Sequence, residues 1–207
     1  CIGGDGNWSN PMNWSSATGG LPGTCLPTMR DTVYFDGNSF SAANQVVTLD
    51  VDGFCAKMDW SGMSFIAEMH MLKDLNVSYE VVLNPSLTVT RNNTASTWSF
   101  LPEGNFFYSP FGAETDVNVI YSGTTLTDTL FINNNVNLGA EGFLMITKGT
   151  CISLADTIVA TAMYLFSNDP KVVHLNATYL QLIYGWNSDA LTATTVDAGT
   201  SVIEITG

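Results

Sequence analysis

The acidic pair Asp50 and Asp52 is the first place where this chain could do chemistry. The two residues alternate with the apolar Leu49 and Val51, so we expect both carboxylates on the outer face of one strand. Clustered carboxylates in a groove support glycoside hydrolysis, and a cationic base beside Ca²⁺-binding aspartates supports polysaccharide lysis. Alternating acids on an outer strand face are usually just solvated. We therefore assign no catalytic residue, although three cations could act as a lyase base: Arg30, Arg91 and Lys57.

The same oxygen-bearing side chains are the weak candidates for a bound metal. Asp50 and Asp52, and separately the run Asp5-Gly6-Asn7, offer hard oxygen ligands for Ca²⁺. Neither group matches an EF-hand loop or the calcium-binding nonapeptide repeat, so turns are the preferred interpretation and no cofactor is required. His70 and His174 stand far apart, without a nucleophile motif near either one, and we expect structural or surface roles for them.

Four cysteines offer redox chemistry: Cys1, Cys25, Cys55 and Cys151. They form no C-x-x-C pair and no zinc-finger spacing with histidine. An even count in an acidic chain rich in Thr and Asn favours disulfides and an oxidising compartment, with three possible pairings. Buried free thiols are the alternative.

Charge narrows the range of partners. Six basic residues against 19 acidic ones give a formal net charge of −13, and charged residues make up 12% of the chain, about half the usual share of roughly 25%. Nucleic acid is excluded as a partner, because phosphate binding needs a patch of Lys and Arg that scattered cations cannot form. Anionic membrane surfaces are disfavoured for the same reason. The chain also holds no apolar run near the roughly 20 residues that a spanning helix needs.

The elements that position these side chains are short strands. One unit of β-branched and apolar residues between turn signals recurs along the chain, most clearly at 86–90, 128–133, 142–147, 150–154, 171–176 and 201–206. Polarity comes from Asn, Thr, Ser and Gly, which suit sheet faces and turns rather than helices. Because Asn-Gly hairpin turns and long strictly alternating strands are missing, we predict an all-β fold, a right-handed parallel β-helix (β-solenoid).

An irregular N-terminal cap is expected before the coils. Residues 1–24 are rich in Gly, Asn, Ser and Pro but contain Trp8 and Trp14, which need a surface to pack on, and the open end of a strand stack is one. We therefore divide the chain into a cap region, 1–30, and one continuous β-helix, 31–207. Two further stretches are interpreted as buried: the Met-rich segment 61–80, where one helical turn is plausible, and the aromatic segment 105–116, for which an exposed aromatic contact is the alternative.

Both ends of the chain resemble one class of proteins. The opening segments 6–8, 13–15, 26–27, 31–40, 47–50 and 55–62, and the ending 197–207 with its GTSVIEITG rung, are similar to large secreted adhesin-like surface proteins of the Bacteroidota that carry β-helical regions and are exported by the type IX system. The middle of the chain shares with these proteins only the general strand-and-turn pattern. The resemblance implies an extracellular or cell-surface location. It also implies O-glycosylation at Asp-Ser/Thr-apolar triplets, with Thr32, Thr129 and Thr157 as candidate sites.

The leading functional prediction is a non-enzymatic extracellular structural or adhesive β-helix, part of a cell-surface adhesin, stalk or self-assembling filament. The alternative is a polysaccharide-degrading or polysaccharide-binding β-helix, lyase-like, tailspike-like or lectin-like, with surface glycans as partners and Trp60, Trp98 or Trp186 as sugar platforms. Tryptophans within a strand-and-turn repeat are more often packed at corners than exposed to ligands. We therefore rank the lectin-like function below the structural one.

The last rung is the expected assembly edge. A strand stack that stops leaves unpaired backbone groups, and such edges pair with other chains. We predict that the C-terminal edge is covered by self-association or by further β-helix repeats of the same polypeptide. Its residues are Ser201, Val202, Ile203, Glu204 and Ile205.

Overall fold

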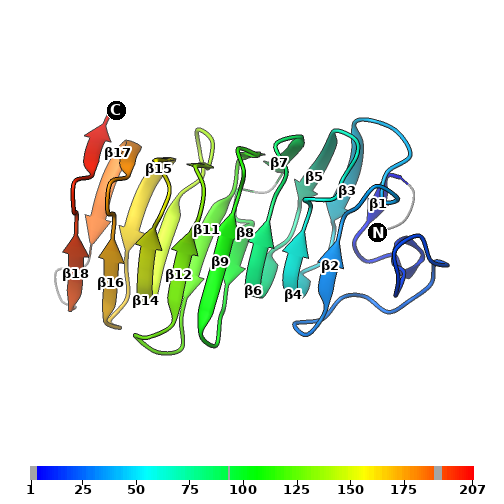
Figure 1. The fold of residues 1–207 in the computed structure, drawn as a ribbon, viewed down its shortest axis with the longest axis horizontal. Helices are drawn as coiled ribbons and strands as arrows, with labels where there is room; N and C mark the ends of the chain where they lie inside the picture. The colour runs from blue at the N-terminus through cyan, green and yellow to red at the C-terminus, as the bar shows by residue number, and fades with distance from the viewer. Residues whose placement is uncertain (1–3, 93, 189–192) are drawn as a thin grey trace.

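The computed structural model is an elongated stack of parallel strands, and it describes residues 4–92, 94–188 and 193–207 (Figure 1). The strands wind into a β-solenoid of about 7 turns. Within the described residues there is no α-helix, and the one helical element is a single 3₁₀ turn, η1 (Pro11–Asn13). The prediction of an all-β parallel solenoid with an irregular cap is confirmed.

Each coil contributes strands to three faces, which we number in chain order. Face 1 holds β1 (Gly6–Asn7), β3 (Gln45–Leu49), β5 (Ala67–Met71), β7 (Leu87–Arg91), β10 (Glu114–Thr115), β13 (Val136–Asn137), the first halves of β15 (Thr157–Leu165) and β17 (Tyr179–Ser188), and β19 (Val202–Ile205). Face 2 holds the first halves of β4 (Gly53–Asp59), β6 (Leu75–Val82) and β14 (Leu144–Ser153), then β8 (Thr97–Phe100), β11 (Asn118–Ser122) and the second halves of β15 and β17. Face 3 holds β2 (Thr32–Tyr34), the second halves of β4, β6 and β14, then β9 (Asn105–Ser109), β12 (Thr129–Ile132), β16 (Lys171–His174) and β18 (Thr194–Asp197), and is turned to the viewer in Figure 1.

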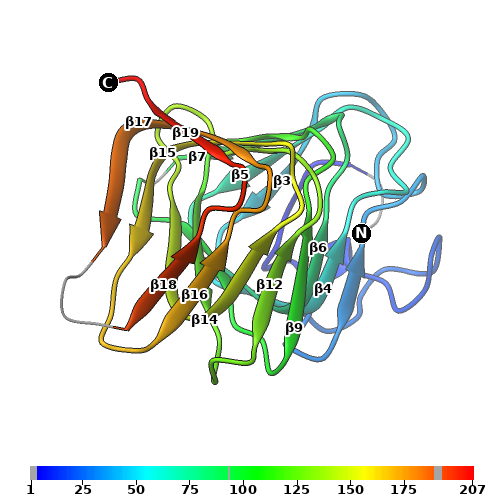
Figure 2. The same ribbon diagram turned by 60° about the vertical axis from the view of Figure 1, so that its left-hand side comes forward.

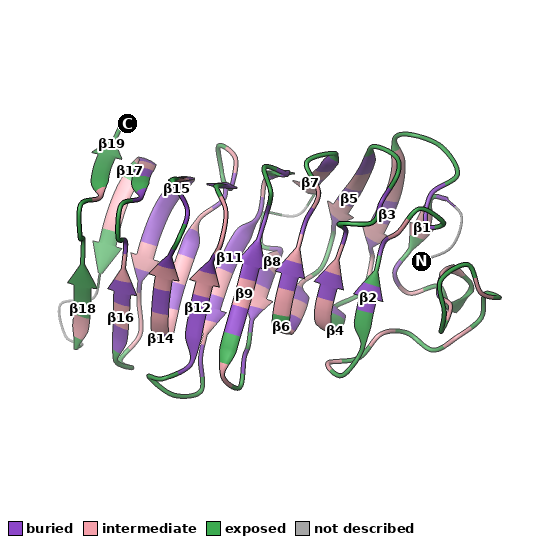
Figure 3. Cartoon of the chain, viewed as in Figure 1, coloured by how far each residue is buried: buried purple, intermediate pink, exposed green. Residues whose placement is uncertain are grey.

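Parallel register lines up apolar side chains from coil to coil inside the solenoid. On face 3, Val33, Met58, Val81 and Tyr108 are successive Cα partners, and all four are buried. The residues between them point outward, because side chains alternate along a strand. Figure 3 shows the result as bands of buried residues repeating along the stack. We call such a set of aligned inward side chains from successive coils an inward column. The core contains an inward column behind each face.

Several strands bend from one face to the next without a break. The pairing register shifts between Cys55 and Lys57 in β4, and between Ala160 and Ala162 in β15, as expected for β-bulges. In β14 the bend lies at Gly149, which has a φ of 102° and would place a Cβ 2.8 Å from the carbonyl oxygen of Asp128. A side chain at this position would be both strained and crowded, so glycine is required there.

Aromatic side chains close the N-terminal end of the core. Trp8 and Trp14 are buried with ring centroids 4.8 Å apart, and the indole N–H of Trp14 donates to the carbonyl oxygen of Trp8 at 2.9 Å. Beneath them Phe35 stacks on Trp60 at a centroid distance of 3.6 Å. The cap region also contributes a strand, because β1 pairs with β3. The first coil therefore begins within residues 1–30.

The Met-rich segment 61–80 and the aromatic segment 105–116 were both predicted to be buried, and the structure agrees with this prediction only in part. Met63, Met69 and Met71 are buried, as predicted, but the segment forms strands rather than a helical turn. In the aromatic segment, Phe106 and Tyr108 point into the core, whereas Phe111 is half-exposed. The prediction that this segment is buried is thus correct for Phe106, Tyr108, Ala113 and Thr115, and wrong for Phe111, which lies at the corner that follows β9.

Arg91 joins three coils at the corner between faces 1 and 2. Its side chain is 4% exposed, and its guanidinium donates to the carbonyl oxygens of Asp116 at 3.0 Å and Thr94 at 3.1 Å. It also donates to the Asp116 carboxylate at 3.2 Å and lies 3.7 Å from the Glu141 carboxylate. A cation at the end of an inward column is stable there because backbone and acidic oxygens surround it.

Replacing Arg91 by alanine should therefore destabilise the solenoid. We expect a loss of about 2–3 kcal/mol in the free energy of unfolding, because charged hydrogen bonds are lost and carbonyl oxygens lose their donor. Denaturant titration measures it. Arg30→Ala is the control, since that side chain is exposed and should change stability by less than about 0.5 kcal/mol. Equal stability of the two variants would contradict the assigned role.

Candidate functional site

The two acids proposed for catalysis or calcium lie at a corner rather than on a strand face. β3 ends at Leu49, and Asp50 and Asp52 belong to the turn before Gly53. The prediction that they share a strand face is wrong because the chain must turn there: a Cβ at Gly53 would lie 2.7 Å from the Leu49 side chain, so the backbone passes tightly over the core. Val51, predicted to face inward, is 37% exposed for the same reason.

Both carboxylates are engaged with the backbone. Asp50 accepts hydrogen bonds from the N–H and hydroxyl of Ser9, at 2.9 and 2.5 Å, which ties the cap to the second coil. Partial burial opposes ionisation, but these bonds outweigh it and hold the pKa of Asp50 below its usual value. Asp52 accepts from the N–H of Asp74 at 3.3 Å. Within the described residues no three His, Cys, Asp or Glu side chains gather as a metal site would require.

The histidines face acidic side chains on the outer surface. His70 Nε2 lies 2.8 Å from the carboxylate of Glu68 on the same strand. His174 Nδ1 lies 3.2 Å from the carboxylate of Asp197 on the next coil. The surface role predicted for them is consistent with these positions, which are on face 1 for His70 and on face 3 for His174.

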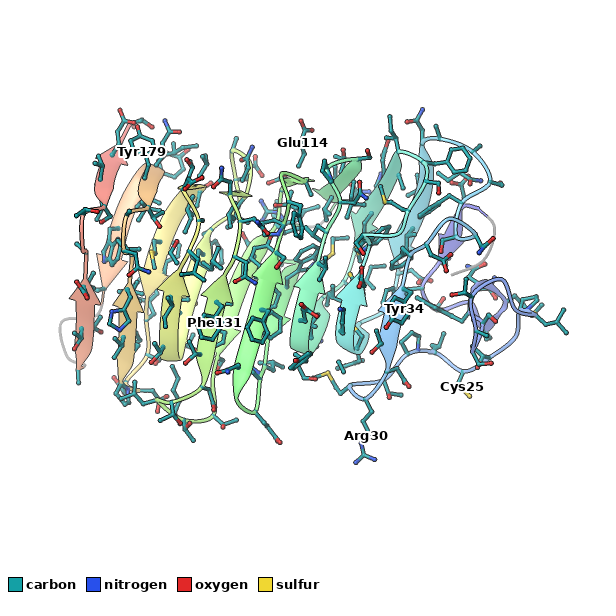
Figure 4. The ribbon with its side chains drawn as sticks, in the orientation of Figure 1. Cys25, Arg30, Tyr34, Glu114, Phe131 and Tyr179 are labelled. Carbon is teal, nitrogen blue, oxygen red and sulfur yellow. The ribbon has the colours of Figure 1, made fainter. Side chains whose placement is uncertain are left out.

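The three described cysteines are free thiols, which corrects the disulfide prediction for Cys25, Cys55 and Cys151. Cys55 and Cys151 are buried on β4 and β14, four strand steps apart along the stack. At roughly 4.8 Å per step this is about 19 Å, far beyond the Cα separation of roughly 4.4–6.8 Å that a disulfide spans. Burial raises the pKa of each of these two thiols to about 12. Cys25 is exposed on the cap (Figure 4), and Cys1 lies outside the described residues.

Two of the three tryptophans predicted as sugar platforms are not on the surface. Trp60 and Trp98 are fully buried, and the indole N–H of Trp98 points at the sulfur of Met71 at 3.0 Å. Trp186 is half-buried and packs against the core. The prediction of a sugar platform at Trp60 or Trp98 is wrong because both indoles occupy inward columns. Phe131 lies on the outer side of face 3 (Figure 4). Its ring stacks on that of Phe107 from the preceding coil at a centroid distance of 5.3 Å, so these ring faces pack against each other.

The threonines predicted to carry O-glycans differ in exposure. Thr32 is exposed on β2, Thr157 is half-buried at the start of β15, and Thr129 is buried. The hydroxyl of Thr129 donates to the carbonyl oxygen of Thr127 at 3.1 Å. Glycosylation at these sites stays a prediction, and its steric access is best at Thr32.

The C-terminal coil is where the predicted assembly edge lies, and its apolar residues are uncovered. β18 continues the column of β16, and β19 continues that of the first half of β17. Val173, Leu180 and Leu182 are each 0% exposed, but their partners on the last coil are far more open: Val196 41%, Ile203 43% and Ile205 54%. Figure 3 shows the contrast at the C-terminal end. Of the predicted edge residues, Val202, Ile203, Glu204 and Ile205 form β19, and Ser201 directly precedes it.

Two outward pairs fasten this coil to the one before it. Asp197 accepts a hydrogen bond from His174 on face 3, and the Tyr179 hydroxyl donates to the Glu204 carboxylate on face 1. The bond from His174 lowers the pKa of Asp197, and the bond to Glu204 raises the pKa of the Tyr179 phenol. Pairing across coils was not predicted from the sequence. The signal available was the spacing, since 23 and 25 residues separate the partners, close to one coil.

Comparisons with known proteins return no relatives: the chain matches no family description, no curated protein and no solved structure. Across residues 4–92, 94–188 and 193–207, no helix has the length and apolar character to cross a membrane.

Removing the Tyr179 hydroxyl should loosen the last coil while leaving the rest intact. In Tyr179→Phe we expect faster hydrogen exchange of the β19 amides, because Glu204 loses its donor, with little change in global unfolding. Exchange measured by mass spectrometry on peptides from 193–207 checks this. Tyr184→Phe is the control, since that side chain is 77% exposed. Identical exchange in the two variants would show that the pair does not hold the coil.

Proposed function

We propose that the protein is a non-enzymatic, extracellular structural β-solenoid that serves as a segment of a cell-surface adhesin or stalk. The observation that carries the proposal is the uncovered last coil, whose inward column continues the core but is exposed. The two ends of the chain resemble, in sequence, secreted surface proteins of the Bacteroidota, and this resemblance supports an extracellular location. The polar residues first considered for catalysis support a structural role, because Asp50 and Arg91 both fasten one coil to another.

A further coil is the natural cover for this end. β18 and β19 are each paired along one edge, and no described strand lies on their other edge. A coil of strands placed there would pair the free N–H and C=O groups and bury Val196, Ile203 and Ile205 together. An irregular loop could cover the side chains but would leave most of the backbone groups unpaired.

For the 207-residue chain in solution, the occupant we propose is the C-terminal coil of a second copy. At the opposite end Trp8 and Trp14 are 1% and 4% exposed, so the residues described there offer no open column to receive the last coil. Two C-terminal ends offer each other the same exposed edge and the same apolar side chains. Self-complementary contact of this kind produces a two-fold dimer.

Introducing a charge into the inward column should abolish this association. We expect the chain to form a dimer in sedimentation equilibrium, and Ile203→Lys to shift it to monomer by removing about 2 kcal/mol of apolar burial from each copy. Val202→Lys is the matched control, because Val202 is the neighbouring residue on β19 and pairs with the outward Tyr179. A wild-type chain that stays monomeric at all concentrations, or two variants that behave alike, would refute the proposed contact.

The extracellular assignment is checked through its modification. In protein recovered from the surface of its native cells, we expect a glycan on Thr32, which is exposed within the Asp31-Thr32-Val33 triplet. Glycopeptide mass spectrometry measures it, with the buried Thr129 as the internal comparison. Absence of the protein from the cell surface would overturn the location, and an unmodified Thr32 peptide would overturn the glycosylation.

A further inference from the structure

A groove lies along the corner between face 3 and face 1, away from the last coil. Three successive turns of the chain line it, following β9, β12 and β14, which stand side by side in Figures 1 and 2. Its volume is about 380 Å³, within the range of roughly 300–1,000 Å³ typical of small-ligand sites. The side chains that define it are Phe111, Asn134, Asn135, Leu154 and Asp156.

Phe111 is placed in this groove at a conformational cost. Its φ is 49°, in the left-handed region that disfavours a residue with a Cβ, and its side chain is 50% exposed. The core therefore gains little from the ring, and the adjacent Gly112, with a φ of 82°, shows that glycine is accepted in this turn. A strained residue with an exposed aromatic ring points to a role outside folding.

The three asparagines at the next turn are not equivalent. Asn133 donates to the hydroxyl of Ser109 at 3.1 Å, and Asn135 accepts from the N–H groups of Asp156 and Thr157 at 2.9 and 3.0 Å. Asn134 lies between them, and its buried amide oxygen has no hydrogen-bond partner in the part of the chain that the structure describes. A buried acceptor without a partner costs free energy, so a rotation of the Asn134 side chain that turned its amide toward the groove would let a ligand hydroxyl bond to it favourably.

The chemistry of the groove fits a sugar ring. An exposed aromatic ring and Leu154 offer apolar surface to the C–H face of a hexose, while the Asn134 amide and the exposed Asp156 carboxylate offer hydrogen bonds to hydroxyls. Among the described residues no Lys or Arg lines the groove, and the chain carries a net charge of −13. Acidic sugars would be repelled by this surface.

We infer that this corner groove binds a neutral saccharide. The site uses Phe111 as the stacking surface and Asn134 as the hydrogen-bonding group. The assignment is independent of the proposed assembly, because none of these residues lies on the C-terminal coil.

Binding of neutral oligosaccharides to the full chain tests the inference. The probes are gluco-, manno- and galacto-oligosaccharides, with oligogalacturonate as the anionic comparison, first immobilised as a panel and then titrated by calorimetry. We expect at least one neutral probe to bind, and Phe111→Gly and Asn134→Ala each to weaken it by about tenfold or more. Tyr184→Ala, which removes another exposed aromatic ring, should bind as the wild type does.

Phe111→Gly separates ligand binding from folding. Glycine relieves the positive φ, so this variant should keep or raise the melting temperature while losing the saccharide. The inference is overturned if no neutral probe binds, if the anionic probe binds more tightly, if Phe111→Gly binds unchanged, or if Tyr184→Ala loses binding equally. A fall in the melting temperature of Phe111→Gly would also overturn it, since the ring would then serve the fold.

Discussion

Each coil of this solenoid can bury its inward side chains only if a neighbouring coil covers them. The requirement is met throughout the middle of the stack, where parallel register places apolar residues of successive coils in contact. The two ends show two different outcomes. At the N-terminal end, Trp8 and Trp14 cover the first column in place of a coil, whereas at the C-terminal end Ile203 and Ile205 stand uncovered. The proposed assembly follows from that asymmetry.

Coil repetition also explains where the charged and polar side chains go. The faces are occupied by hydrogen-bonded strands, so positions for irregular backbone occur at the corners, and there Asp50 and Arg91 bond to neighbouring turns. The same repetition lines up corners of successive coils, so residues about one coil apart, such as Phe111 and Asn134, share a groove. The corners of the solenoid thus hold both the side chains that link neighbouring coils and the groove proposed to bind a ligand.

Much of the architecture could be predicted because it depends on local pattern. β-branched runs between turn signals predicted strands, and two tryptophans in a loop-like segment predicted a cap. The candidate site was predicted less well. Asp50 and Asp52 alternate with apolar residues as a strand would, yet a tight turn at Gly53 places them at a corner. From the sequence alone, Trp60 and Trp98 could equally have faced outward. Their direction depends on the pairing register of their strands, because the observed register is the one that places the apolar side chains inside.

Composition and short-range periodicity determined that the chain forms stacked parallel strands with turns between them, because those preferences act within a few residues. The tertiary structure decided which residues meet across coils. Cys55 and Cys151 both face the core, but they lie four strand steps apart and cannot bond. His174 and Asp197, distant in the chain, are neighbours because one coil separates them. A coil that is one residue longer or shorter brings different residues together across coils. The length of each coil depends on how the chain turns at the corners, which short-range sequence patterns do not specify.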